Sequence, residues 1–340
     1  MLDPRIREDL YKIRTRLLEQ GALLTYDALR ACYDLFRARF GPEVLAGLDG
    51  AELLNLMHLH GNHDSLVYWL EFKDDEEFPA QFGSIAGGSA LKFRIYRRNE
   101  TGEWMTGSPS QQKAIGVEAA VAIARQHRDQ LLAGAQLLEA LPAEATPADY
   151  EQLQRQMDEV APDVSRLAWG HKYLHLLYPN RLDDYHSEEY QRFHLIKLLQ
   201  MPPEQAGRYV IAAPYVSIAR ELDWPLNHLT SVLTARNGRP HRVWRIGTRV
   251  EGSTDIWPLM HDLGVIAIGW SALGTLDWLD ASNERFEQLK QALGQNYYSP
   301  QQSQTISRKA GEIRDFVAAG GGGRGRESAR LGACLHIPPR

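Results

Sequence analysis

The chain of 340 residues carries 38 basic and 43 acidic side chains, so its formal net charge is −5 and its surface is not broadly basic. A protein with this balance contacts nucleic acid only through a local basic patch. The two cysteines, Cys32 and Cys334, lie far apart and in no C-x-x-C pattern, which argues against a disulfide framework and a zinc knuckle. The length and a hydrophobic fraction of 44% favour at least two globular domains.

The N-terminal residues are charged from the third position and lack the apolar core of a signal sequence. No window of the chain reaches the run of apolar residues that a membrane span needs. We therefore expect a cytoplasmic protein with no membrane partner, in a reducing compartment.

Helical periodicity dominates the first sixty residues. Apolar residues recur at intervals of three and four over 5–40, and "DGAELLNLMHLHG" predicts a further helix with Asp49 as its N-cap. From Ser65 the composition changes, because "LVYWLEF" and "LKFRIYRR" are rich in β-forming residues. The "NETG" that follows has the composition of a hairpin turn. This part of the chain is therefore expected to mix helices with strands.

Helical spacing resumes after the expected hairpin and continues, with breaks at prolines, to "NGRP" at 237–240. The next unit reads as strand, helix, strand and two helices, and the last residues show no period. These patterns predict an α+β protein in four parts: an N-terminal α+β domain at 1–205, a helical connector at 206–240, a small mixed domain at 241–319 and a disordered Gly/Arg tail at 320–340.

The histidine-rich segment "HLHGNHD" is a first candidate site. It resembles the H-x-H-x-D-H motif of metallo-β-lactamase-like hydrolases, with His58, His60, His63 and Asp64 as the metal ligands. Asn62 stands where that motif has an aspartate, and a helical rather than a strand pattern precedes it. A polar turn is therefore the favoured interpretation, and a metal-dependent hydrolase that uses these four residues is the alternative.

A second histidine pair, His171 and His175, stands at i and i+4 and is expected to share one helix face. Lys172 occupies the place of the general-base glutamate in H-E-x-x-H, which argues against a zinc peptidase. Further polar residues follow closely and would complete a site: Asp183, Asp184 and His186. A structural role is favoured, because paired aspartates in a loop are usually a turn with a cap.

The basic segment "KFRIYRR" predicts a strand with Lys92, Arg94, Tyr96 and Arg98 on one face. Such a face suits a phosphate backbone, so Lys92, Arg94 and Arg98 are candidate nucleic-acid contacts. The acidic run at 71–78 offers the competing interpretation, a surface of salt bridges.

The sequence lacks the short motifs of P-loop nucleotide binding and of serine hydrolases. No G-x-x-x-x-G-K-[ST] or G-x-S-x-G pattern occurs, and in the C-terminal glycines Gly325 is followed by Arg326 rather than lysine. We therefore predict no P-loop ATP hydrolysis and no cofactor, and nothing in the sequence requires an enzyme.

Trp244, Trp257 and Trp270 stand out in the unit at 241–319, and Trp270 ends an apolar alternating run directly after a glycine. Tryptophans placed in this way serve either as the core of a small sheet or as a stacking surface for a flat ligand. The segment "VWRIGTRVEGSTDIWPLMHDLGVIAIGW", with "FEQLKQAL" and "SRKAGEIRDFV" after it, resembles the EVE domain, a relative of the YTH and PUA-like folds. The resemblance implies a small barrel-like sheet that holds a flipped, modified base in a pocket formed here by Trp244, Trp257, Trp270 and Ser271.

The preceding region, with "WGHKYLHLLYPNRLDDYHSEEYQRFHLIKLLQMPP" and "GSALKFRIYRRNETGEW", resembles the non-ATPase part of McrB-like AAA-type restriction proteins. This resemblance implies modified DNA, or RNA, as the ligand, and an ATPase domain and a nuclease subunit as partners. After residue 319 the chain departs from the family pattern and turns to glycine, arginine and proline. We therefore expect an incomplete PUA-like domain, from a truncation or a frame shift.

The sequence thus predicts a recognition module without its own catalysis, and a pure assembly scaffold is the third hypothesis.

Overall fold

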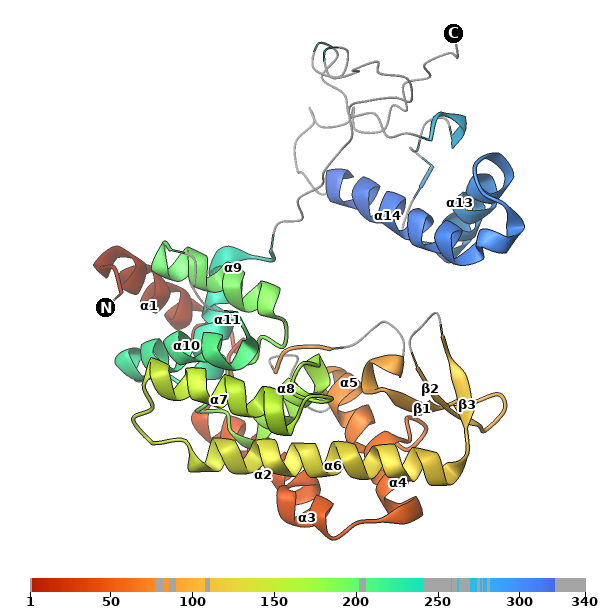
Figure 1. Cartoon of the computed structure of the whole chain (residues 1–340). Coiled ribbons are helices and arrows are strands. Elements are labelled where there is room, and N and C mark those ends of the chain that lie inside the picture. Colours follow the sequence, from red (N-terminus) through yellow and green to blue (C-terminus); the bar gives the residue numbers. More distant parts are fainter. Residues whose placement is uncertain are drawn as a thin grey trace. The chain divides into compact units, whose positions relative to one another are not determined.

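The computed structural model describes residues 2–76, 82–85, 90–107, 111–201 and 206–240, followed in the C-terminal part by 258, 262, 270–273, 276, 278–279 and 282–321. The chain divides into two compact units, unit 1 at 1–240 and unit 2 at 241–340 (Figure 1). Each unit is described by itself below.

Helices make up most of unit 1, and a small antiparallel sheet accompanies them, which confirms the predicted α+β class. The helices are α1 Pro4–Glu19, α2 Tyr26–Phe40, α3 Pro42–Ala46, α4 Gly50–His58, α5 Leu66–Glu76, α6 Val117–Ala140, α7 Pro147–Val160, α8 Ala168–Leu177, α9 Glu188–Leu199, α10 Arg208–Leu222 and α11 Leu226–Asn237. The strands are β1 Ile95–Arg97, β2 Trp104–Thr106 and β3 Lys113–Ile115. No helix of the described part is long and apolar enough to cross a membrane.

Polar caps set several of these helix starts. The Asp49 carboxylate accepts from the backbone N–H of Gly50 at 2.7 Å, which confirms it as the N-cap of α4. Thr25 caps α2 through Ala28. Thr146 and Asp149 form a capping box at the start of α7. The helix boundaries therefore follow from short polar signals that the sequence displays.

The three strands pair in the order β1-β2-β3 with a simple antiparallel register, in which Met105 faces Tyr96 on one side and Ala114 on the other. The predicted "NETG" turn is confirmed, because the Gly102 N–H donates to the Arg98 carbonyl at 2.8 Å. Gly102 has a φ of 71°, a value that glycine adopts without a steric penalty.

One strand prediction is wrong, and another is confirmed only in part. "LVYWLEF" lies in α5, where four consecutive residues from Leu66 to Trp69 are buried. A short run that is apolar on every side fits a buried helix as well as a buried strand, so its composition misleads. "LKFRIYRR" begins as a 3₁₀ turn over Ala90–Phe93, and Arg94 follows with a φ of 69°. The strand therefore starts only at Ile95.

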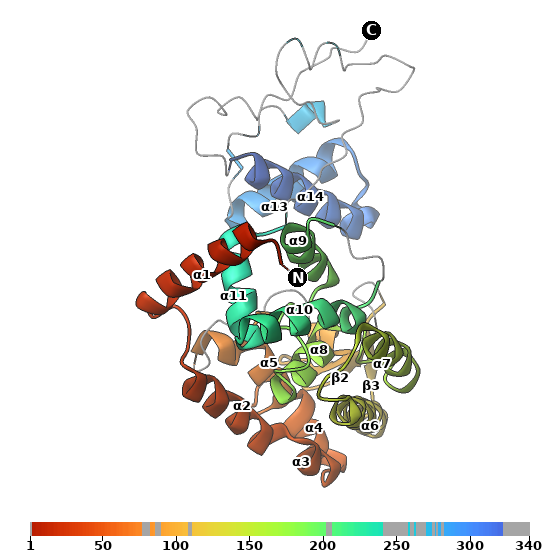
Figure 2. The ribbon, with the colours of Figure 1, turned by 90° about the vertical axis from the view of Figure 1, so that its left-hand side faces the viewer.

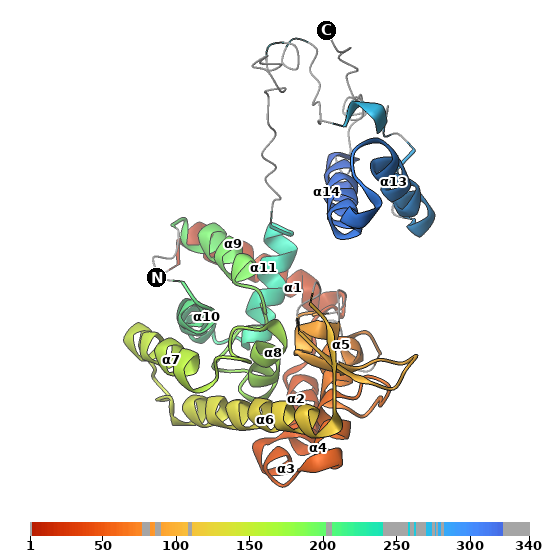
Figure 3. The same cartoon turned by 45° about the vertical axis from the view of Figure 1, so that its right-hand side comes forward.

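The long helix α6 runs along one side of unit 1, next to α7 and α4, and it begins directly after β3 (Figure 1). In the views of Figures 2 and 3, α9 and α11 lie at one end of the unit and α3 and α4 at the other. The buried helix α8 lies between them, in contact with α2, α5 and α6. One hydrophobic core extends through all these elements.

Residues 206–240 belong to this core. Helix α10 packs against α7 and α9, and α11 packs against α1 at the other end of the sequence. The segment predicted as a connector is therefore an integral part of unit 1.

The described part of unit 2 is a helical pair, α13 Asn283–Asn296 and α14 Ser303–Gly321, with short 3₁₀ turns at Ser271–Leu273 and Pro300–Gln302. Its core gathers Leu289, Leu293 and Ile306 around the pair. The two helices at the end of this unit confirm the sequence prediction. The expected strands before Trp270 and the tail from 322 lie outside the described residues, so the PUA-like barrel stays a prediction.

The two glycines Gly83 and Gly50 offer a matched test of packing. Both have a positive φ, 72° and 55°, but a Cβ on Gly83 would lie 2.1 Å from the Asp184 carbonyl oxygen, whereas one on Gly50 meets no atom within 4 Å. Gly50→Ala is expected to cost about 1–2 kcal/mol from the backbone conformation alone. Gly83→Ala should cost about 2 kcal/mol more, because the steric overlap adds to it. Equal losses in urea unfolding would show that the segment around Gly83 moves without cost.

Candidate functional site

Two adjoining cavities on unit 1 share Asn180, Trp224 and Leu226, and together we call them the Trp224 groove. Their volumes are about 340 and 450 Å³. Such sizes are typical of sites for small molecules and single ligand groups. The groove is therefore a candidate site on unit 1.

One face of α2 forms a wall of the larger cavity, with Tyr26, Arg30, Tyr33 and Arg37 along it. These residues stand at i, i+4, i+7 and i+11, so the helical period brings them to one side. Tyr26 is 50% exposed, and Arg30 is exposed, while the deeper Tyr33 has a buried hydroxyl. Burial raises the pKa of Tyr33 well above its usual value, with a smaller contribution from the charge of Asp184, so its hydroxyl stays protonated.

The turn between α10 and α11 places Trp224 where the cavities meet. Asp223 ends α10 in a left-handed conformation with a φ of 54°, and the Trp224 N–H donates back to the Ala219 carbonyl at 2.9 Å. Pro225 precedes α11 and has no N–H to continue α10. Arg14 lies over the Trp224 ring, with its guanidinium carbon 4.8 Å from the centroid.

Four guanidinium groups around the groove form no salt bridge with the described residues: Arg14, Arg30, Arg37 and Arg181. Arg37 donates instead to the Leu177 carbonyl at 2.6 Å, at the end of α8, and Arg181 donates to Leu141 at 2.6 Å. A carbonyl satisfies the hydrogen bond but leaves the positive charge in place. The exposed carboxylates of Asp34 and Asp223 also line the larger cavity and balance the charges of Arg30 and Arg37, so the excess positive charge of the groove comes from Arg14 and Arg181.

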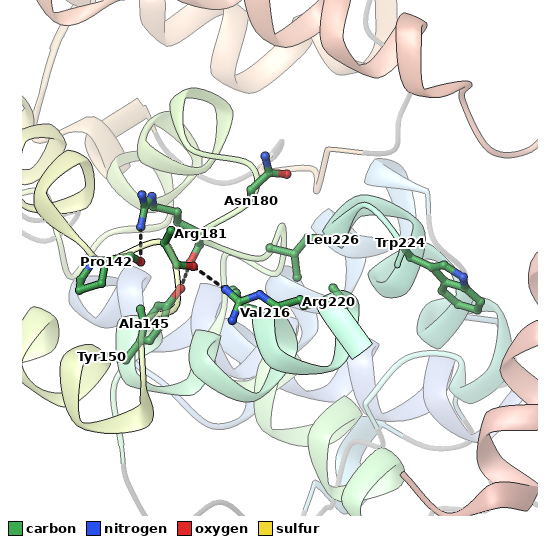
Figure 4. A pocket seen from close by; sticks show the side chains of 11 residues that line it. Pro142, Ala145, Tyr150, Asn180, Arg181, Val216, Arg220, Trp224 and Leu226 are labelled. Atoms are coloured by element: carbon green, nitrogen blue, oxygen red, sulfur yellow. Dashed lines mark hydrogen bonds between the residues drawn. The ribbon is translucent and has the colours of Figure 1, made fainter. Parts of the chain in front are cut away.

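Figure 4 shows the smaller cavity, where two arginines approach the segment after α6. Arg181 donates to the Pro142 carbonyl at 2.9 Å and Arg220 to the Ala143 carbonyl at 2.7 Å. The Tyr150 hydroxyl donates in turn to the Arg181 carbonyl at 2.9 Å. Arg220 also pairs with Glu144 at 2.8 Å, which neutralises its charge. Hydrogen bonds to main-chain carbonyls thus hold both arginines of the smaller cavity in place. Of the two, Arg181 is the one without a carboxylate partner in the described residues.

The predicted basic strand is not a free cationic face. Lys92 pairs with the buried carboxylate of Glu71 and donates to the Ile85 carbonyl at 2.7 Å. Burial alone would raise the pKa of Glu71, but His60 and Lys92 lower it to a net value below its usual range. The acidic run at 71–78 therefore supplies the partner of Lys92, as the competing interpretation expected. Arg94 and Arg98 flank β1 without joining Lys92 on one strand face.

The residues of "HLHGNHD" turn toward different partners. His58 is fully buried, with Nε2 3.3 Å from Nδ1 of His127, and His60 packs on the Phe93 ring. His63 stacks on Tyr68 with ring centroids 4.3 Å apart, and Asp64 pairs with Arg39. In the part of the chain that the structure describes, no three His, Cys, Asp or Glu side chains are grouped as a metal site.

The histidines of α8 and the following loop do come together, in the interior. His171, His175 and His186 are buried, and Nδ1 of His171 lies 3.0 Å from Nδ1 of His186. We call these three residues the buried histidine cluster. Burial lowers the pKa of His171 and His186 well below the usual value and that of His175 to about 4, so all three are neutral near pH 7.

The hydrogen bonds fix the tautomer of each neutral ring. His186 Nε2 donates to the Phe82 carbonyl at 2.8 Å, so its Nδ1 accepts from Nδ1–H of His171. His175 donates from Nδ1 to the Leu182 carbonyl at 2.7 Å. The cluster therefore ties α8 to the segments before and after it, which supports the structural role predicted for it.

Asp183 lies in the loop after α8 and is also buried. Burial raises its pKa to about 8, against the opposing hydrogen bond from the Gln191 amide at 2.8 Å. Asp184 accepts from the Asn227 amide at 2.9 Å, and Asn227 itself lines the groove. The polar interior thus reaches the floor of the Trp224 groove.

Of the predicted base pocket, Trp244 and Trp257 lie outside the described residues, as does the side chain of Ser271. Trp270 is half-buried against the core of α13 and α14, and the Lys309 ammonium lies 5.8 Å from its ring centroid. Trp270 therefore packs at the edge of the unit 2 core.

Comparison with protein-family models, curated proteins and solved structures finds no match for this chain.

The buried histidines should make unit 1 sensitive to acid. Their pKa values are lower in the folded than in the unfolded state, so the unfolded chain binds more protons below about pH 6.5. Each neutral histidine then loses about 1.4 kcal/mol of stabilisation per pH unit, for His175 down to about pH 4. Asp183, with a raised pKa, has the opposite sign and loses stabilisation as the pH rises from about 4 to 8. Stability, measured by thermal melting, should therefore be greatest near pH 6.5.

The variant Asp183→Asn provides the control for this profile. It should remove the decline between pH 6.5 and 8 and keep the decline below 6.5, whatever its effect on overall stability. A profile that is flat from pH 4 to 6.5 would contradict the neutral, buried state of the histidines.

Trp270 is tested by truncation. Trp270→Ala should lower the stability of unit 2 by about 1–3 kcal/mol, less than for a fully buried tryptophan, because the ring is only partly buried against the core. An unchanged melting transition of unit 2, together with lost discrimination between modified and plain duplexes, would assign the ring to a base pocket instead.

Proposed function

We propose that this chain is a nucleic-acid-binding recognition module in which the Trp224 groove contacts the phosphate backbone. The observation that carries the proposal is the group of guanidinium charges that no carboxylate pairs in the described residues: Arg14, Arg30, Arg37 and Arg181. Arginine suits phosphate recognition because its planar group donates two parallel hydrogen bonds.

The contrast with the rest of unit 1 supports this site. Arg7 pairs with Glu221, Arg125 with Asp49 and Arg236 with Asp9, so many arginines of the unit are neutralised by carboxylates. Arg14, Arg37 and Arg181 are held by carbonyl groups or by an aromatic ring, and Arg30 is exposed without a hydrogen-bond partner in the described residues. In a chain with a net charge of −5, this local concentration of positive charge is the feature that would attract a polyanion.

The resemblance to McrB-like proteins extends the proposal to modification-dependent restriction. In that case unit 2 would read a modified base with Trp244, Trp257, Trp270 and Ser271, and an ATPase domain and a nuclease subunit would supply catalysis. The groove of unit 1 would then hold DNA, or RNA, in position while unit 2 reads it. Arg94 and Arg98 remain candidates for additional backbone contacts.

Arg30→Ala tests the groove with little risk to the fold, because the side chain is exposed and has no hydrogen-bond partner in the described residues. We expect binding to a labelled duplex or single strand to weaken about two- to tenfold at low salt, equally for all sequences. The slope of log affinity against log salt should fall by about one unit or less.

Arg155→Ala is the matched control, since Arg155 is an exposed arginine of α7 that does not line the groove. Its affinity and salt slope should equal those of the unchanged protein. If the two variants behave alike, the groove does not bind the backbone.

A further inference from the structure

The mouth of the Trp224 groove carries an exposed aromatic ring in a fixed position. Tyr26 is 50% exposed and lines the larger cavity. Its hydroxyl accepts from the Arg14 guanidinium at 3.0 Å and donates to the Asp223 carbonyl at 3.4 Å. The ring also packs against His228, with centroids 5.5 Å apart. These contacts come from α1, α10 and α11, so the ring is held from three sides.

Two hydrogen bonds fix the tautomer of His228. Its Nε2 donates to the Leu24 carbonyl at 2.8 Å, so Nδ1 of the neutral ring accepts from Arg14 at 3.3 Å. Burial lowers its pKa, Leu24 opposes this, and the charge of Arg14 lowers it further. Arg14 thus links Tyr26, His228 and Trp224, and the exposed part of the Tyr26 ring needs no reorganisation to receive a flat ligand.

One cationic group, the Arg30 guanidinium, adjoins this ring on the same helix face. Arg30 stands one helical turn after Tyr26, and both line the cavity of about 450 Å³. A flat ring beside guanidinium groups matches one nucleotide unit, with the base on the ring and the phosphate on the cations. A base inside a duplex has both faces covered by its neighbours, so only an unpaired base can stack in this way.

We propose that the Trp224 groove binds single-stranded nucleic acid, with an unpaired base stacked on Tyr26 and an adjoining phosphate at Arg30. This inference rests on the proposed function and specifies its ligand. The cavity volume is consistent with it, because it suits a nucleotide and is far too small for a duplex.

The test compares two single strands of equal length, one of thymidine nucleotides and one of abasic sites, which keep the phosphates but have no bases. Tyr26→Leu should weaken binding of the thymidine strand about five- to a hundredfold and leave the abasic strand within about twofold. Tyr26→Phe keeps the ring and should stay within about threefold on both strands. Fluorescence anisotropy at low salt measures each affinity.

Leu35→Ala is the matched control, since Leu35 is an exposed apolar residue of α2, 51% accessible, that does not line the groove. It should bind both strands normally. Equal losses for Tyr26→Phe and Tyr26→Leu on both strands would overturn the stacking role and reduce Tyr26 to a support for Arg14. Binding of a duplex as tight as that of the thymidine strand would also overturn it.

The outcome for Arg30→Ala distinguishes a failure of this inference from a failure of the proposed function. If Arg30→Ala weakens the binding of both strands while Tyr26→Leu weakens the binding of neither, the groove binds phosphate and only the stacking inference fails. If Arg30→Ala weakens neither strand, the proposed function fails with it.

Discussion

The burial of α8 along nearly its whole length is the constraint around which unit 1 is organised. Every residue from Trp169 to Leu177 is buried, including His171, Lys172 and His175. A polar group without a partner in the interior costs about 1–3 kcal/mol, so the surrounding elements must supply partners. Leu182 and His186 do so for Nδ1 of His175 and of His171, and Phe82 in turn accepts from His186. The same demand reaches the C-terminal end of α8, where Arg37 satisfies the Leu177 carbonyl and Tyr173 donates to the Phe40 carbonyl.

This demand connects the fold with the candidate site. Arg37 caps the end of α8 with a charged group, and Arg181 does the same for the Leu141 carbonyl after α6. Basic groups at helix C-termini are stabilising because they meet the negative end of the helix dipole. A carboxylate partner would remove that benefit, so the positive charge at the groove also serves the stability of two core helices. Arg37 and Arg181 therefore stabilise the fold and, in the proposed function, also attract the polyanion.

Local signals in the sequence were sufficient to predict many of the helices of unit 1. Thr25 and Gly41 mark the limits of α2, Asp49 caps α4, and the i, i+4 spacing of His171 and His175 indicates their common face. The prediction failed where only burial distinguishes the alternatives, because the apolar run from Leu66 fits a helix or a strand until its neighbours are known. The Trp224 groove was missed for a related reason. Its α2 face shows the period of Tyr26, Arg30, Tyr33 and Arg37, but the opposite wall comes from the turn after α10, and no local pattern brings Trp224 beside them.

The pairing of α1 with α11 joins the two ends of unit 1 and has a consequence for synthesis of the chain. The contacts of Arg14 with His228 and of Asp9 with Arg236 span more than two hundred positions, with separations of 214 and 227 residues. Contacts of such separation form late, because the intervening chain must first be ordered. During translation, α1 therefore leaves the ribosome long before its partner exists, with Ile6 and Leu10 still exposed to solvent. Until α11 arrives, that apolar face is open to chaperones and to neighbouring nascent chains.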